Sequence, residues 1–234
     1  MDPVFMWETF QTLVAGLPLT LQLAATSIIA GSILALALAL IAVLGGPISQ
    51  AFVKSYVFVF RGSPLLVQMF LIYYGLGQFR PTLQELGVWP FFRDPHWCAV
   101  LALTLNTAAY CSEIFRGGLE AVSNQQVEAA RACGMSGTLL FRRIVLPIAI
   151  RHVLPAYGNE IILMVKATAL ASVITLMEVT GLAGKLIADS FRAFEVFAVA
   201  AAIYLAINFI ITRVILAIEY RLSPHLRSRS SSLT

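Results

Sequence analysis

The chain has 234 residues, of which 59% are hydrophobic and 12% are charged, and its mean hydropathy is +0.84. A soluble domain carries about 25% charged residues, so this composition indicates a protein embedded in a bilayer. The net charge of +4 does not indicate nucleic-acid binding, because the basic residues are not gathered on a polar domain. Three cysteines without motif spacing and three scattered histidines predict neither a disulfide framework nor a metal site.

The N-terminal residues do not form a standard secretory signal. Residues 1–10 contain Asp2 and Glu8 but no Lys or Arg, whereas a signal peptide begins with a basic region. This acidic start also predicts that the N-terminus lies outside the membrane.

Five hydrophobic segments predict an all-α membrane protein with five transmembrane helices, since one crossing needs about 20 apolar residues. The predicted spans are 17–44, 52–76, 97–115, 153–176 and 196–218. The second is less uniform, because Lys54 and Arg61 lie near its start. Polar or mixed segments at 78–96 and 177–195 separate the spans. We therefore expect one membrane domain over residues 1–222, followed by a disordered, Ser- and Arg-rich cytoplasmic tail at 223–234.

The distribution of basic residues predicts the orientation of the chain, because cytoplasmic loops carry an excess of Lys and Arg. With the N-terminus in the periplasm, nine basic residues lie in inner segments: Lys54, Arg116, Arg131, Arg142, Arg143, Arg151, Arg221, Arg227 and Arg229. Four lie in outer segments: Arg80, Arg93, Lys185 and Arg192. The polar segment 116–150 and the C-terminus are therefore predicted to be cytoplasmic. An odd number of spans argues against a self-contained inverted-repeat transporter.

The cytoplasmic segment has the pattern of a helical hairpin over about 121–147. Ser123 and Gln126 have the spacing of a capping box, and Gly134 suits a helix stop. Ser136 is placed to cap a second amphipathic helix, which we expect Pro147 to close before the fourth span begins. An ordinary loop on the lipid headgroups would have a similar composition.

The hairpin also resembles the EAA loop of ABC importer permeases. The shared residues are Glu128-Ala129-Ala130, Gly134, Ile144 and Leu146-Pro147, all at the family spacing. Further stretches are similar to the polar amino acid branch, above all to its histidine/lysine/arginine and opine permease subunits: Phe60 to Gln68, Leu105 to Tyr110 and Gly158 to Glu160. The resemblance covers about residues 16–222. One departure is that many relatives have Pro and Gly where Ser123 and Gln125 stand.

This resemblance implies a type I ABC importer permease, which is a transport subunit and not an enzyme. It implies that a coupling helix docks on a cytoplasmic ATPase through Glu128, Ala129, Ala130, Arg131 and Gly134. It also implies a second, non-identical permease subunit, two ATP-binding cassette subunits that bind ATP and Mg, and a periplasmic solute-binding protein. Membrane lipid is a further expected partner, and no nucleic acid is expected.

The chain itself is not expected to bind a cofactor. Residues 181–185 resemble a phosphate-binding loop only superficially, since the motif needs four residues between its glycines and a Ser or Thr after the lysine. Here two residues separate Gly181 from Gly184, and Leu186 follows the lysine.

Polar side chains inside the spans are candidates for substrate binding, because a charge at mid-membrane costs about 2.5–3.5 kcal/mol on insertion scales. Asn106, Tyr110 and Glu113 share one helix face, as do Glu160, Met164 and Thr168. We expect Glu160 to bind a substrate ammonium or guanidinium group. The other predicted substrate-binding residues are Asn106, Tyr110, Gln68 and Met164.

Structural roles are the alternative for some of these polar residues. Glu113 stands three residues before Arg116 and is more simply an ion-pair partner. Lys166 lies about 120° around the helix from Glu160 and is placed to bridge to a companion subunit. An ion pair between Glu128 and Arg131 on the hairpin is also possible.

The predicted function is that of a permease subunit in an ATP-driven importer of polar, cationic amino acids or opines in the bacterial inner membrane. Two alternatives remain from the sequence. One is an ion-coupled secondary amino acid carrier that uses Glu160 and Lys166. The other is a membrane anchor whose hairpin recruits a cytoplasmic regulator.

Overall fold

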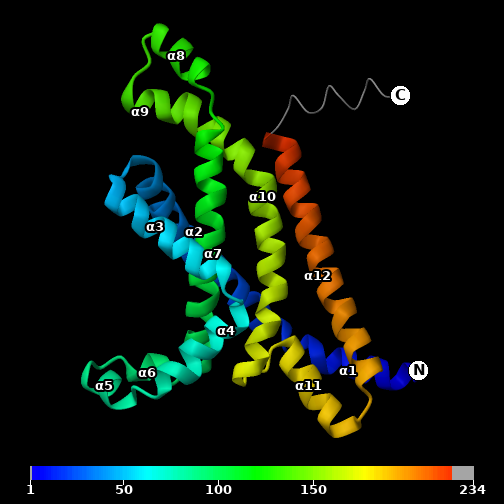
Figure 1. Cartoon of the computed structure of the whole chain (residues 1–234). Coiled ribbons are helices and arrows are strands. Elements are labelled where there is room, and N and C mark those ends of the chain that lie inside the picture. Colours follow the sequence, from blue (N-terminus) through cyan, green and yellow to red (C-terminus); the bar gives the residue numbers. More distant parts are fainter. Residues whose placement is uncertain (1, 223–234) are drawn as a thin grey trace, which may run out of the picture.

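The computed structural model describes residues 2–222, so the tail predicted to be disordered at 223–234 lies outside the described residues. The described chain is helical and contains no strand (Figure 1). Its helices are α1 (Pro3–Val14), α2 (Leu17–Leu44), α3 (Pro47–Gly62), α4 (Leu65–Phe70), the π-helical turn η1 (Leu71–Gly75), α5 (Arg80–Glu85), α6 (Trp89–Phe92), α7 (Pro95–Glu120), α8 (Asn124–Ala132), α9 (Gly137–Leu140), the π-helical turn η2 (Phe141–Val145), α10 (Leu146–Ala167), the 3₁₀ helix η3 (Thr168–Ile174), α11 (Val179–Ser190) and α12 (Ala193–Leu222).

Three of the predicted spans are unbroken helices, the second is sharply bent, and the fourth ends at a bend. Helices α2, α7 and α12 confirm the first, third and fifth spans. The second predicted span is bent by 101° between α3 and the segment Leu65–Gly75. The fourth is joined to α11 with a bend of 47°. Counting each bent pair as one span, the described chain has up to five.

The sharp bend in the second span follows from Pro64, although the apolar run there predicted a continuous helix. Proline disfavours a helical conformation in the residue before it, and Ser63 accordingly has an extended backbone with φ −110° and ψ 145°. Helix α3 ends at Gly62, and α4 begins just after Pro64 in a new direction.

Helix α1 was not predicted, although its start has a readable signal in the Asp2-Pro3 pair. The Asp2 side chain accepts a hydrogen bond from the backbone N–H of Val4 at 3.0 Å and also caps Phe5. The backbone N–H of Phe5 and the Arg192 guanidinium, 3.5 Å away, hold the pKa of Asp2 below its usual value. These contacts attach the N-terminus to the start of α12, and α1 packs on α11 and α12.

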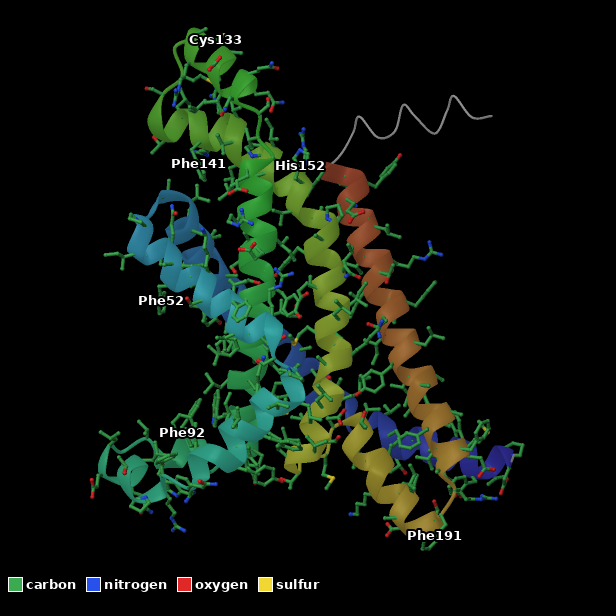
Figure 2. The ribbon with its side chains drawn as sticks, viewed as in Figure 1. Phe52, Phe92, Cys133, Phe141, His152 and Phe191 are labelled. Carbon is green, nitrogen blue, oxygen red and sulfur yellow. The ribbon has the colours of Figure 1, made fainter. Side chains whose placement is uncertain are left out.

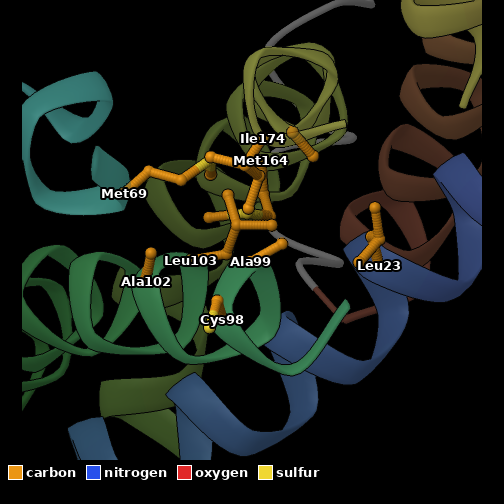
Figure 3. Close-up of a cluster of buried hydrophobic side chains, with 9 residues drawn as sticks. Leu23, Met69, Cys98, Ala99, Ala102, Leu103, Met164 and Ile174 are labelled. Atoms are coloured by element: carbon orange, nitrogen blue, oxygen red, sulfur yellow. The ribbon is translucent and has the colours of Figure 1, made fainter. Parts of the chain in front are cut away.

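The main core lies where α2, α4, α7, α10 and η3 meet (Figure 3). Met69 extends from α4 toward Leu103 of α7 and Met164 of α10. Small residues on α7, such as Ala99 and Ala102, allow the neighbouring helices to approach closely. Helix α2 runs along α7 and makes the most extensive helix pair of the described chain.

A buried carboxylate anchors the start of α11. Glu178 is fully buried and accepts hydrogen bonds from the backbone N–H groups of Thr180 at 2.9 Å and Gly181 at 2.8 Å. It also accepts one from the Tyr204 hydroxyl of α12 at 2.7 Å. Thr20 of α2 adds a longer contact at 3.5 Å. Since buried polar groups need partners, this cluster ties α2, α11 and α12 together at one end of the molecule.

The two ends of the helical bundle differ in character (Figure 1). Helices α8 and α9 project as a hairpin at one end, which is also the end where α12 finishes. Helices α1, α5, α6 and α11 lie at the opposite end, together with the N-terminus.

Adjacent glycines near the end of α7 give a matched test of this packing. A Cβ added at Gly118 would overlap the Val153 side chain of α10 and stand 3.1 Å from the Ala149 carbonyl, whereas one at Gly117 would meet nothing. We expect Gly118→Ala to destabilise the protein by about 1–3 kcal/mol through overpacking. Gly117→Ala should be neutral or stabilising by up to about 1 kcal/mol, since alanine favours helix. Thermal unfolding in detergent measures both, and equal shifts would contradict the close contact of α7 with α10.

Candidate functional site

Helix α8, the first helix of the hairpin, begins and ends as its sequence predicted. The Ser123 hydroxyl accepts a hydrogen bond from the Gln126 N–H at 3.4 Å, and the Gln126 side chain accepts one from the Ser123 N–H at 3.3 Å, which completes the capping box. At the other end of α8, Gly134 has a left-handed φ of +78°. The N–H of Gly134 bonds to the Arg131 carbonyl, and that of Met135 bonds to the Ala130 carbonyl, as in a Schellman motif.

The five predicted coupling residues divide into one buried and four exposed positions. Ala130 is 6% exposed and faces the rest of the hairpin. Glu128, Ala129, Arg131 and Gly134 are exposed. The ion pair that the spacing of Glu128 and Arg131 allows is not among those of the described chain. The outer face of α8 is thus free for a partner, and Cys133 marks the tip of the hairpin (Figure 2).

The second half of the hairpin differs from the prediction in two ways. Ser136 precedes α9, but its side chain makes no capping hydrogen bond. Pro147 does not close a separate helix, because helical backbone runs without a break from Gly137 to Ile174. Pro147 is instead the second residue of α10 and follows the π-helical turn η2 within this continuous segment.

Gln68 and Asn106, both predicted substrate-binding residues, form one hydrogen-bond network at the bend between α3 and α4. The Gln68 amide nitrogen donates to the Phe60 carbonyl at 2.8 Å, the Ser63 carbonyl at 3.0 Å and the Ser63 hydroxyl at 2.9 Å. The Asn106 amide nitrogen donates to the Gln68 side-chain oxygen at 3.1 Å and to the Phe60 carbonyl at 3.3 Å. Both side chains are buried, so their donors are used within the chain.

Arg61 connects Tyr110 with the two carboxylates of this region, a role that the sequence did not indicate. Its guanidinium carbon lies 5.0 Å from the centre of the Tyr110 ring, a cation–π distance. It also interacts electrostatically with Glu113 and Glu160. The feature that could have indicated a role for Arg61 was its place in the last turn of α3, directly before the proline-induced bend.

The two carboxylates have different environments. Glu113 forms an ion pair with Arg116 at 2.7 Å, and Arg116 forms a second with Glu120 at 2.7 Å, which confirms the structural alternative for Glu113. Glu160 is only 8% exposed, yet within residues 2–222 it has neither a hydrogen bond nor an ion pair that satisfies the usual distance limits.

Met164 belongs to the main core. It is buried, and its sulfur lies 3.7 Å from the Thr107 hydroxyl oxygen. Together with Glu160 of α10 and Thr168, the first residue of η3, it forms one buried helix face, as their spacing predicted.

Comparison with known proteins identifies the family. Residues 27–224 match the model of the binding-protein-dependent transport system inner membrane component. The chain belongs to this family. It is a permease subunit of an ABC importer and an inner-membrane protein, and this membership favours the importer over the carrier and the membrane anchor.

Individual relatives and a solved structure agree with this assignment. The permease is 56% identical over 226 residues to the octopine transport system permease protein OccM of Rhizobium meliloti, covering 97% of this chain and 92% of the relative. It is 52% identical over 229 residues to the nopaline transport system permease protein NocM of Agrobacterium fabrum, covering 98% and 95%. The crystal structure of an amino acid ABC transporter with histidines matches with a TM-score of 0.82 and 33% identity, covering 94% of this chain and 99% of that one. The predicted all-α, type I importer fold is therefore confirmed.

The amide network predicts a stability role for Gln68 that can be separated from substrate binding. Gln68→Leu leaves the carbonyls of Phe60 and Ser63 without this donor, so we expect it to lower the free energy of unfolding by about 1–3 kcal/mol. Gln78→Leu is the control, because Gln78 lies only ten residues later in the sequence but is exposed. It should have little effect on the free energy of unfolding. Thermal unfolding of both variants is the measurement. Normal stability of Gln68→Leu together with lost uptake would instead indicate a direct substrate ligand.

Proposed function

We propose that this permease imports polar, cationic amino acids or opines, and that a separate ATPase supplies the energy. Two relatives are named for octopine and nopaline, and the matching crystal structure contains histidines. Octopine and nopaline carry a guanidinium group and histidine carries an ammonium group, so a cationic nitrogen group, although not a net positive charge, is common to all three. The observation that carries the proposal is Glu160, a buried carboxylate on a spanning helix without an ion-pair partner in the described chain.

Glu160 is the proposed ligand of the substrate cation. A carboxylate inside the membrane is costly unless a cavity or a partner compensates it, and a bound ammonium or guanidinium group would do so by charge-assisted hydrogen bonds. Tyr110 is proposed to line the same path, with Arg61 over its ring. Because the donors of Gln68 and Asn106 are used within the chain, we assign these residues to shaping the wall. Met164 packs behind this wall as part of the main core.

The hairpin is proposed to be the cytoplasmic docking element for the ATPase. Glu128, Ala129, Arg131 and Gly134 are exposed on it, and small residues allow a partner to approach the helix closely. The hairpin and the end of α12 lie opposite the N-terminus (Figure 1). With the excess of arginines at the hairpin end, this arrangement supports a periplasmic N-terminus and a cytoplasmic C-terminus.

A complete importer requires further subunits. Lys166 is exposed on the spanning helix α10, which supports a companion permease that covers this charge. We propose a non-identical companion, two ATP-binding cassette subunits that bind ATP and Mg, and a periplasmic solute-binding protein. In this assembly, closure of the ATPase pair moves the hairpin, and α10 transmits the movement to Glu160.

Replacement of Gly134 tests the coupling role. Gly134→Arg places a bulky side chain on the docking surface, and we expect it to abolish uptake while the assembled transporter still hydrolyses ATP. The left-handed φ of +78° adds a strain of about 1–2 kcal/mol for any residue with a Cβ. Uptake into proteoliposomes and ATPase activity are measured on the same preparation.

Gly87→Arg is the matched control for this experiment. Gly87 has a similar φ of +72° and an open environment, but it lies at the opposite end of the molecule. It should bear the same strain and retain coupling. Normal uptake by Gly134→Arg would refute the docking role.

In the unmodified transporter, vanadate should stop uptake, and dissipating the ion gradient with ATP intact should not.

Replacement of Glu160 tests substrate recognition. Glu160→Gln keeps the shape of the side chain but removes its charge, so a charge-assisted hydrogen bond weakens and uptake should fall about tenfold or more. Assembly and hydrolysis of ATP should persist. Glu120→Gln, which breaks only a partly exposed ion pair, serves as the control and should import normally. Unchanged uptake by Glu160→Gln would exclude this carboxylate as the ligand.

A further inference from the structure

An apolar groove runs along the hairpin half of the helical bundle. Its volume is about 460 Å³, and side chains from α2, α7, η2 and α10 line it. Ile33 and Leu36 form one wall, and Phe141, Ile150 and Leu154 belong to the opposite one. The two hydroxyl groups in its lining, of Ser32 and Tyr157, are hydrogen-bonded to each other at 2.8 Å. The groove therefore offers an apolar ligand a continuous hydrocarbon surface.

A second, smaller cavity extends this groove toward the end of α12. It has a volume of about 200 Å³ and shares Leu146 and Ile150 with the groove. Pro147, Arg151 and Leu222 complete its lining. The two cavities thus form one surface that is hydrocarbon along its length and carries a guanidinium at one end.

The charged end of this surface is strongly basic. Arg142 and Arg143 stand between Phe141 and Leu146, which both line the groove, and Arg151 follows on α10. All three arginines are exposed, and residues 129–159 contain no Asp or Glu. Phe141 and His152 mark this end of the molecule in Figure 2. A ligand with an apolar tail and an anionic head matches both parts of the surface.

We propose that this groove binds an anionic phospholipid, with one acyl chain along α2 and α10 and the phosphate beside Arg151. Basic pockets between spanning helices recognise anionic headgroups by the charge of their Lys and Arg side chains. Water is a poor occupant, because a stable water site needs several polar partners. The acyl chain would contact α7 and α10 where they meet the hairpin, so the lipid binds next to the proposed coupling element.

Photolabelling of the whole transporter in nanodiscs tests the site. The probes are phosphatidylglycerol and phosphatidylcholine that each carry a diazirine in the acyl chain, and mass spectrometry locates the labelled residues. We expect phosphatidylglycerol to label residues 32–40 and 146–157 in preference to the rest of the lipid-facing surface. Ile33→Trp should remove most of this labelling by filling the groove. Ile33 is 69% exposed, so the larger side chain does not disturb the core.

Ile29→Trp is the matched control, since Ile29 is 62% exposed on the same helix but does not line the groove. It should label like the unmodified protein. Arg151→Gln should reduce the preference for phosphatidylglycerol over phosphatidylcholine about fivefold, and Arg93→Gln at the opposite end should leave it unchanged. Equal labelling of the two tryptophan variants, an unaltered preference in Arg151→Gln, or cross-linking of the groove to another polypeptide would overturn the proposal.

Discussion

The arrangement of the spans depends on how the chain satisfies one backbone carbonyl at the bend between α3 and α4. In a continuous helix the Phe60 carbonyl would accept the N–H of residue 64, but Pro64 has none. An unsatisfied backbone group in the membrane costs several kcal/mol. The amides of Gln68 and Asn106 replace the missing donor at 2.8 and 3.3 Å. The bend of 101° is therefore compatible with a position inside the membrane.

This bend determines the surroundings of the proposed substrate path. Because α4 leaves α3 sharply, Met69 reaches the core between α7 and α10, while Arg61 remains at the end of α3 over the ring of Tyr110. Asn106 and Tyr110 lie one turn apart on the same face of α7. Asn106 stabilises the bend, and Tyr110 contacts Arg61. The position of Arg61 beside Tyr110 consequently depends on the amide network, although neither residue belongs to it.

Local rules explain which parts of the fold and site were predictable. The spans α2, α7 and α12 follow from long apolar runs, and the ends of α8 follow from Ser123, Gln126 and Gly134, whose partners are close in sequence. The bend at Pro64 had a local signal in Gly62-Ser63-Pro64, but the overall hydrophobicity of residues 52–76 predicted one continuous span. Contacts between distant segments gave no local signal: Gln68 pairs with Asn106 and Glu178 with Tyr204 only after the helices have packed. For the same reason Glu160 was recognisable as unusual, but the contact of Arg61 with Tyr110 was not.

The continuity of the helical backbone provides a physical route between the two proposed sites. Helix α10 carries Glu160 and Pro155 and continues from the hairpin through the π-helical turn η2, and the 14 residues from Leu146 to Glu160 correspond to roughly 21 Å. Neighbouring helices hold this segment closely: a Cβ at Gly118 would overlap Val153, and one at Gly158 would stand 2.5 Å from Ile215 of α12. Such close packing resists bending of α10 within the bundle. A displacement of the hairpin would accordingly move α10 together with α7 and α12, so the surroundings of Glu160 would change as a unit and not by local distortion.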